Sequence, residues 1–155
     1  MEGLSLEKLT QRADLVIAGE VESVASDWSD DSRFIYTSVT VSLLEVIRGK
    51  CLTKHIKVEY KGGKVGEQGM GVSDAPALQE GQTVILFLRP VWSYQSKKFG
   101  FVYRIVGASQ GAYVIDEQEM VRKGGFAVMR RDKNVVDMTM DMPLESFREI
   151  LKKIE

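Results

Sequence analysis

The sequence is poor in the residues that build disulfides, imidazole sites and membrane spans. Its 155 residues include one cysteine, Cys51, and one histidine, His55. A single thiol excludes an internal disulfide, and the common His/Cys zinc sites are excluded unless carboxylates supply most ligands. No apolar run approaches the roughly 18 residues that cross a bilayer, and no charged start leads into an apolar export segment. We therefore expect no membrane span and no signal peptide within this chain.

The chain also lacks a surplus of charge of one sign. It has 21 basic and 22 acidic residues, so its net charge is −1. Proteins that bind nucleic-acid duplexes usually carry excess Lys and Arg, which displace counterions from the phosphates. The balance argues against bulk nucleic-acid binding but not against a local basic patch. The apolar share of 44% and the charged share of 28% are typical of a folded protein, and the length suits one domain.

Helical periodicity is confined to the two ends of the chain. Residues 5–13 predict a short helix that Ser5 caps, with apolar side chains at helical spacing. Residues 143–154 predict an amphipathic helix with Pro143 in its first turn. The apolar face of this second helix consists of Leu144, Phe147, Ile150, Leu151 and Ile154.

Between these helices the apolar period is mostly two, which predicts strands. The predicted strands cover residues 14–25, 33–47, 54–60, 84–88, 97–106 and 112–115. In the third of them, Ile56 and Val58 lie on one side, and Lys57 and Glu59 lie on the polar side. The fourth is continuously apolar, as in a strand buried on both faces, and we expect Pro90 to end it. Residues 117–136 suit short strands and turns.

About six strands with helices only near the ends predict a mainly β protein. We expect a small OB-like β-barrel, closed or partly open, with short terminal helices. It would form one domain over residues 1–155, with its C-terminal helix at about 143–154. A β-sandwich is the alternative.

Several motifs together carry a family resemblance. They are residues 13–21, Tyr36-Thr37, residues 44–49, Gly62-Gly63 with Gly66, Ala75-Pro76 before Glu80-Gly81, residues 84–88, and residues 107–111. In these the chain resembles a family of uncharacterised prokaryotic proteins with an OB-like barrel related to the netrin and metalloproteinase-inhibitor modules. The resemblance implies a periplasmic or cell-surface location, because members are typically exported. The inhibitors act through an amino-terminal cysteine held by disulfides, which this chain lacks, so that activity is not implied.

A long glycine-rich stretch, residues 61–79, exceeds the usual hairpin connection and is a candidate functional loop. Its glycines match neither a phosphate-binding P-loop nor the dinucleotide pattern. They are explained by a loop that needs backbone freedom as it crosses the barrel, or by a loop that shapes a partner-binding surface. Together with an exposed loop after the central strand, it gives the candidate binding residues Gly62, Gly63, Lys64, Gly66, Gln68, Met70, Trp92 and Tyr94.

No combination of side chains assembles a recognisable catalytic site, so we expect no catalytic residue, no cofactor and no metal. Cys51 and His55 are close in sequence, but the turn and the polar strand face favour an incidental thiol and a solvated histidine. Asp27, Asp30 and Asp31 lack EF-hand spacing and indicate a charged turn.

Two further patterns leave alternatives open. Met138, Met140 and Met142 alternate, which suits either Cu(I) ligation or flexible core packing. Seven aromatic residues could include stacking partners for single-stranded nucleic acid: Trp28, Phe34, Tyr36, Trp92, Tyr94, Phe99 and Tyr103. The clustered basic residues lie apart from most of them in sequence: Arg122, Lys123, Arg130, Arg131 and Lys133.

The absence of a catalytic set and the presence of two candidate recognition loops favour a non-catalytic binding or protein-interaction module. Its partner would be an unknown protein or small ligand, and the oligomeric state stays open. One alternative is an OB-type domain that binds single-stranded nucleic acid. The other is an enzyme whose carboxylate or metal site cannot be recognised from sequence.

Overall fold

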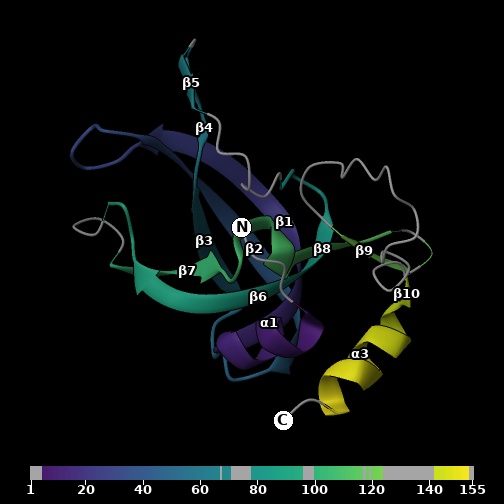
Figure 1. Cartoon of the computed structure of the whole chain (residues 1–155). Coiled ribbons are helices and arrows are strands. Elements are labelled where there is room, and N and C mark those ends of the chain that lie inside the picture. The colour runs from purple at the N-terminus through teal and green to yellow at the C-terminus, as the bar shows by residue number, and fades with distance from the viewer. Residues whose placement is uncertain are drawn as a thin grey trace.

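The computed structural model of the chain describes residues 5–66, 68–70, 78–95, 100–116, 118, 120–123 and 142–153. Helices α1 and α3 lie towards the two ends of the chain, as the periodicity predicts, and the described elements between them are strands and a 3₁₀ turn (Figure 1). In chain order the elements are α1 (Leu6–Arg12), β1 (Leu15–Trp28), β2 (Ile35–Arg48), β3 (His55–Lys61), β4 (Gly63–Val65), β5 (Gln68–Met70), β6 (Thr83–Trp92), β7 (Phe101–Ile105), η1 (Ala108–Gly111), β8 (Ala112–Ile115), β9 (Met120–Lys123), β10 (Met142–Pro143) and α3 (Leu144–Lys153).

Five strands form a ring in the order β1-β2-β3-β7-β6, and β6 pairs back to β1. The neighbours are antiparallel except β3 and β7, which are parallel. The parallel contact has a single registered pair, Val58 with Tyr103, so the ring is a partly open barrel. Strands β8, β9 and β10 extend the sheet beyond β6. The fold is the small, mainly β barrel that the sequence predicts, and not the alternative sandwich.

The apolar side chains of β1 and β6 divide between two cores. Leu15 and Leu86 point into the ring, where they join the cluster that fills the barrel. Val16 and Phe87 point the other way, into a second cluster with residues of α1, β8, β9 and α3. Residues 84–88 are therefore buried on both faces, which confirms the prediction from their continuous apolar run.

The two helices cover the second core. Ser5 Oγ accepts a hydrogen bond from the Lys8 backbone N–H at 3.2 Å and so caps α1, as predicted. Phe147 and Leu151 of α3 are fully buried, and burying such a side chain contributes about 1.5–3 kcal/mol. Arg148 joins α3 to β2 through an ion pair with Glu45 at 2.6 Å. No helix in the described ranges is long and apolar enough to cross a membrane.

Strands β1 and β2 are 14 residues long and pair along nearly their whole length, with register shifts that let the ribbon coil around the barrel. The close approach of their backbones explains Gly19. A Cβ atom at that position would stand 2.6 Å from Val41 Cγ1 and 2.7 Å from the Ser42 carbonyl oxygen. The pattern that predicted these strands also predicted their inward faces, because Val39 and Val41 are fully buried.

The expectation that Pro90 ends the central strand is wrong, because β6 continues to Trp92. β1 pairs with β6 only as far as Leu88, so beyond that residue one edge of β6 has no partner in the ring. The Ser93 N–H donates to the Gly100 carbonyl across the β6–β7 hairpin. The N–H groups of successive residues in a strand point alternately to its two edges. Since the Ser93 N–H points to β7, the Pro90 nitrogen points to the unpaired edge of β6. The missing N–H of proline therefore removes no hydrogen bond between strands.

Candidate functional site

The first group of predicted site residues lies on a hairpin that the sequence did not predict. Residues 61–79 are not irregular throughout, because β4 and β5 pair as a short ribbon that projects beyond the barrel (Figure 1). Gly62 ties its base to the barrel: its N–H donates to the Ile35 carbonyl at 2.8 Å, and its carbonyl accepts from Thr37 Oγ1 at 2.7 Å. This part of the glycine-rich stretch is therefore built from backbone pairing.

Gly63 has a structural reason to be glycine. Its φ is +136°, and a Cβ atom there would collide with Ser26 Oγ and Thr37 Oγ1. Lys64 and Gly66 are exposed near the tip of the ribbon, and nothing lies within 4 Å of a Cβ at Gly66. The backbone of Gln68 and Met70 belongs to β5, while their side chains lie outside the described part of the structure. The described contacts of Gly62 and Gly63 therefore have a structural role, which is to attach the ribbon to the barrel.

The second group, Trp92 and Tyr94, lies at the β6–β7 hairpin, away from the β4–β5 ribbon (Figure 1). Trp92 ends β6 opposite Phe101, and the two rings stack with centroids 4.0 Å apart and planes 23° apart. Both are large apolar side chains in solvent, with 61% of Trp92 and 63% of Phe101 exposed. The structure thus separates the eight predicted residues into two places and adds Phe101 to the second.

Tyr94 is not the exposed loop residue that the sequence suggested, because it is half-buried among rings and cations. Its ring meets Phe34 edge-on at 4.8 Å and Tyr36 at 5.5 Å. The Arg104 guanidinium lies 4.2 Å from the Tyr94 centroid, and Lys61 Nζ lies 4.7 Å from that of Phe34. Such cation–π contacts contribute about 0.5–1 kcal/mol each at exposed sites. The β1–β2 turn, the end of β3 and the β6–β7 connection therefore meet at one end of the barrel.

Glu59 holds this connection in place. It lies on the outer side of β3, opposite to Ile56 and Val58, as predicted, but this polar side chain is not exposed to solvent. The side chain is completely buried, because residues 93–95 fold back over the outer face of β3. Its carboxylate accepts hydrogen bonds from Ser93 Oγ at 2.5 Å and from the Tyr94 N–H at 2.9 Å. Hydrogen bonds to a charged group contribute about 1.5–3 kcal/mol each, which offsets the cost of burying the carboxylate.

Two further hydrogen bonds attach the connection to the end of β1 and the turn after it. Gln95 Nε2 donates to the Trp28 carbonyl at 3.2 Å, and the Asp30 N–H donates to the Tyr94 carbonyl at 3.2 Å. In the turn itself, Asp31 accepts from Ser29 Oγ at 2.7 Å and from the Arg33 N–H at 3.1 Å. The acidic cluster thus stabilises a turn, as predicted.

A polar row crosses the outer face of the barrel beneath Tyr94. Ser38 pairs with Glu59 across β2 and β3, Arg104 lies one residue beyond the β3–β7 pair, and Arg89 is opposite Arg104 on β6. Ser38 Oγ and Arg104 Nε are buried and have no hydrogen-bond partner within the described ranges. Such unsatisfied groups are rare and call for a specific explanation.

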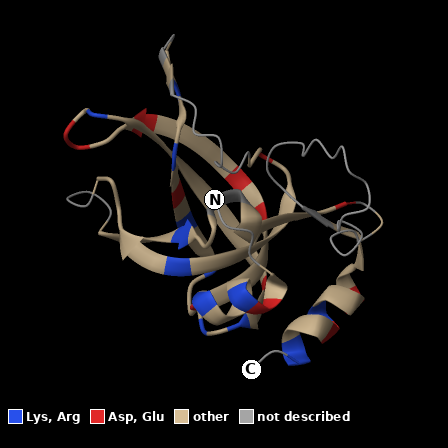
Figure 2. Cartoon of the chain, in the orientation of Figure 1, with Lys and Arg blue, Asp and Glu red and all other residues tan. Residues whose placement is uncertain are grey.

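Four basic side chains occupy outward positions of β3, β7 and β6. They are Lys57, Lys61, Arg104 and Arg89, and Figure 2 shows these strands with blue bands near the β6–β7 end. The acidic residue at these positions, Glu59, is buried and hydrogen-bonded. We call the surface at this end of the barrel, formed by Phe34, Lys61, Arg89, Trp92, Tyr94, Phe101 and Arg104, the aromatic–basic face. Within it, the Trp92–Phe101 stack projects from the side of the β6–β7 hairpin opposite to Arg89 and Arg104, because successive side chains of a strand alternate between its two faces.

The two tyrosines of this region remain neutral at ordinary pH. Burial, reinforced by the Glu59 carboxylate, raises the pKa of Tyr36 to about 12. Burial also raises the pKa of Tyr94, although the Arg104 guanidinium acts in the opposite direction. Both phenols therefore keep their protons, and the aromatic–basic face gains no negative charge from them.

Cys51 and His55 each have a partner of their own. Cys51 Sγ lies 3.4 Å from Thr53 Oγ1, and His55 Nε2 lies 3.3 Å from Glu22 Oε1 at the surface. The arrangement differs from a nucleophile–base pair, in which the thiol and imidazole bond to each other. Within the described ranges, no three His, Cys, Asp or Glu side chains gather as metal ligands would.

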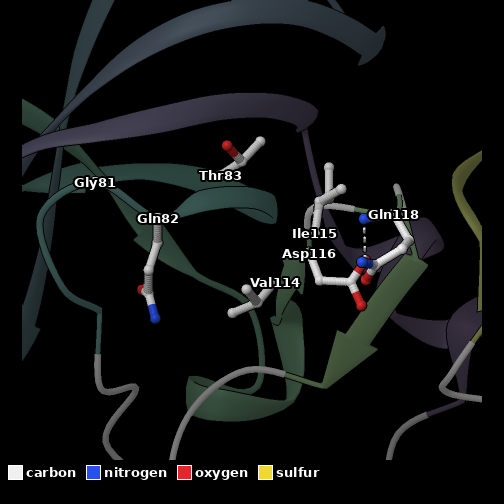
Figure 3. Close-up of a pocket in the computed structure, with 7 residues that line it drawn as sticks. All are labelled: Gly81, Gln82, Thr83, Val114, Ile115, Asp116 and Gln118. Atoms are coloured by element: carbon white, nitrogen blue, oxygen red, sulfur yellow. Dashed lines mark hydrogen bonds between the residues drawn. The ribbon is translucent and has the colours of Figure 1, made fainter.

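A shallow hollow of about 460 Å³ lies between β6 and the β8–β9 turn (Figure 3). Its polar lining includes Gln82, Thr83, Asp116 and Gln118. The Asp116 carboxylate already accepts the backbone N–H groups of Gln118 and Met120, each at 2.9 Å. This carboxylate holds a turn, so the hollow is a weaker candidate than the aromatic–basic face.

Several predicted positions lie outside the described residues. Among the alternating methionines, Met138 and Met140 fall there, and Met142 pairs with Val121 in β10. Arg130, Arg131, Lys133 and Phe99 also fall there. The structure instead places two other basic residues, Lys61 of β3 and Arg104 of β7, against the predicted aromatic residues Phe34 and Tyr94.

Sequence reasoning missed Glu59, Phe101, Arg89 and Arg104 as site residues. One signal was available: a hairpin joining the strands near residues 84–88 and 97–106 would place an aromatic residue opposite Trp92. The sequence around Glu59 does not indicate that its side chain is buried. The burial depends on residues 93–95, which are distant in sequence and fold over it. No protein-family model matches the chain. A search of curated proteins finds no match either.

Proposed function

We propose that this chain is a non-catalytic binding module whose recognition surface is the aromatic–basic face. The observation that carries the proposal is the exposed stack of Trp92 and Phe101, with 61% and 63% of their surfaces in solvent. Large aromatic rings are enriched at interfaces, where they supply contact area at little entropic cost. Two stacked rings left in solvent contribute little hydrophobic stabilisation to the fold. A ligand that covers them explains why they are exposed.

The fold supports this choice of surface. The closed order β1-β2-β3-β7-β6 of five strands, with its parallel β3–β7 join, supports the OB-type barrel as part of this proposal. Such barrels bind ligands across their second and third strands and the loops after the first and fourth. Here those loops are the β1–β2 turn and the β6–β7 connection, which meet through Asp30 and Tyr94. An extracytoplasmic location, from the family resemblance, is part of the same proposal.

Binding is tested with libraries of oligosaccharides, peptides and single-stranded oligonucleotides passed over immobilised protein. Wild type is compared with Trp92→Ala and with Leu52→Ala, a control at a fully exposed apolar residue on the β2–β3 connection. We expect at least one compound to bind wild type and Leu52→Ala equally and Trp92→Ala about tenfold more weakly, a loss of roughly 1.4 kcal/mol. Equal binding to all three chains, or no binding at all, contradicts the proposal.

A Lys64→Ala variant tests the β4–β5 ribbon in the same assay. Because the exposed Lys64 is not part of the aromatic–basic face, we expect the binding of this variant to equal that of wild type. A loss as large as that of Trp92→Ala would move the recognition surface to the ribbon.

Binding of single-stranded nucleic acid is a second candidate function. Aromatic platforms joined to a positive groove are the usual arrangement for such binding, and this face places the rings of Phe34 and Tyr94 beside Lys61 and Arg104. The oligonucleotides of the library give the test, because phosphate contacts make affinity fall steeply with salt. Oligonucleotide binding that does not change between low and high salt, or no binding, removes this candidate.

A further inference from the structure

We infer that a water molecule is bound on the outer face of the barrel, where it bridges Ser38, Glu59 and Arg104 beneath Tyr94. The inference does not depend on the proposed function, because it concerns how the barrel is held closed and not what it binds. Ser38 Oγ and Arg104 Nε are both buried, and neither has a hydrogen-bond partner among the described residues. Buried polar groups nearly always have a partner, and an ordered water supplies it where no protein group does.

The strand register places the three side chains next to one another. Ser38 and Glu59 are opposite each other on β2 and β3, so they share one face of the sheet. Glu59 and Arg104 each follow a member of the parallel pair Val58–Tyr103, whose side chains belong to the inner cluster. Because neighbouring strands lie about 4.8 Å apart and side chains alternate, Arg104 lies beside Glu59 on the outer face. One row therefore contains both unpartnered atoms and a carboxylate.

Tyr94 covers this row and shows that its members converge. Its N–H donates to Glu59 Oε1 at 2.9 Å, and its ring centroid lies 4.2 Å from the Arg104 guanidinium carbon. Ser93 Oγ donates to Glu59 Oε2 at 2.5 Å, and the Glu59 side chain is completely buried. Bulk solvent is therefore kept from the row, and its unpartnered atoms need a partner that is held within it.

The chemistry of the three side chains selects water as this partner. The Glu59 carboxylate disfavours an anion and the Arg104 guanidinium disfavours a cation, so the bound species is neutral. Arg104 Nε–H can only donate, and a carboxylate can only accept, so the species must both accept and donate. Glu59 has about four lone-pair sites, and Ser93 and Tyr94 use two of them. A water that accepts from Arg104, donates to Glu59 and bonds to the Ser38 hydroxyl has the usual number of partners, about three.

Such a water would connect three strands at the join that has the least pairing. β3 and β7 share a single registered pair, Val58 with Tyr103. The hydrogen bonds of the water to Glu59 and Arg104 cross that join, and its bond to Ser38 extends the connection to β2. We therefore expect the water to exchange with bulk solvent only when residues 93–95 move away from β3.

A pair of serine variants tests the bridge through the sign of its effect on stability. If the Ser38 hydroxyl binds the water, Ser38→Ala removes one of its partners, and we expect the equilibrium constant for unfolding in urea to rise about fivefold. If the hydroxyl has no partner, the same change removes a desolvated polar group, and the constant falls. Ser42→Ala is the control, because Ser42 lies on the same strand and outward face and its Oγ is not one of the unpartnered buried atoms.

The control accounts for the different strand propensities of serine and alanine. A constant for Ser38→Ala that is equal to or below that of Ser42→Ala overturns the inference.

NMR of the whole wild-type chain detects the water directly at Arg104. The signs of cross-peaks between water and the arginine Hε protons, compared in NOESY and ROESY spectra, separate a long-lived water from surface water and from proton exchange. We expect a long-lived water signal at Arg104 and none at Arg12, an exposed arginine on α1. Absence of the signal at Arg104, or the same signal at Arg12, overturns the inference whichever result the serine variants give.

Discussion

At the scale of single residues, Glu59 controls the shape of the aromatic–basic face. Its carboxylate fixes Ser93 and the backbone of Tyr94, which lie 34 and 35 residues away in sequence. Trp92 and Tyr94 are adjacent to these anchors, so their rings keep a defined position relative to β3. A rigid presentation of aromatic side chains reduces the entropy that a ligand must remove on binding.

Replacing Glu59 by glutamine is therefore expected to destabilise the protein. The amide keeps the size of the side chain, but it brings an N–H group towards donors that need an acceptor. Leaving a buried donor unsatisfied costs about 1–3 kcal/mol, and urea unfolding measures it. Glu22→Gln is the matched control, because Glu22 is exposed and pairs only with His55 at the surface. Equal unfolding midpoints for the two variants would contradict the anchoring role of Glu59.

The single residues also show where sequence patterns stop being informative. Alternation places Glu59 on the outer face of β3, and the outer face is where it lies. Whether that face is wet depends on residues 93–95, which cover it only after the barrel has closed. Trp92 was identified as a candidate from its place in a loop, whereas Arg89 and Arg104 acquire meaning only through their register across β6 and β7.

At the scale of elements, the strands were predictable because their apolar residues alternate or run continuously. The ends of the strands and the β4–β5 ribbon were not. Pro90 is tolerated within β6 because the pairing of β6 with β1 ends at Leu88, before the proline is reached. Where that pairing ends depends on β1, so the local sequence around Pro90 does not reveal it. The ribbon has too few apolar residues to show a period, and its pairing is visible only in its backbone register.

Gly63 gives a test of the ribbon's attachment. Gly63→Ala combines an unfavourable φ of +136° with collisions at Ser26 and Thr37, so we expect a loss of about 2–4 kcal/mol in unfolding free energy. Gly69→Ala on the facing strand is the control, because its nearest contact would be the Gly63 carbonyl oxygen at 3.9 Å. Thermal or urea unfolding distinguishes them. Similar stabilities for the two variants would show that the base of the ribbon is not tightly fitted.

At the scale of the whole molecule, the sequence predicted the fold class better than the site. The mainly β class, the doubly buried β6 and the terminal helices all follow from local patterns. The ring order, and with it the meeting of the β1–β2 turn and the β6–β7 connection, follows from pairings between distant strands. The aromatic–basic face is a product of that order, so its members are scattered along the sequence.

Alkaline pH tests the packing of the molecule as a whole. Burial raises the pKa of all five tyrosines, to about 12 for Tyr36. Because these pKa values exceed the ordinary 10.0, the unfolded chain holds fewer protons than the folded chain once the pH passes that value. Stability is therefore complete below about pH 10 and falls as the pH rises towards 12.

The measurement is tyrosinate absorbance, followed together with circular dichroism. We expect phenolate to appear late and together with unfolding. Tyr36→Phe is the control, since it should remove one titrating group and reduce the pH dependence of stability above pH 10. Full ionisation of all five tyrosines near pH 10, with the fold intact, would show that they are solvated.

The single registered pair between β3 and β7 makes this join the thinnest part of the ring. The hydrogen bonds of Glu59 to the segment after β6 cross the same join. They therefore connect its two sides in addition to the strand pairing. A molecule that contacts both Lys61 of β3 and Arg104 of β7 would bridge the two sides of that join. A bound ligand would then hold the two strands of the join together. The free energy of unfolding would increase with the affinity and concentration of that ligand.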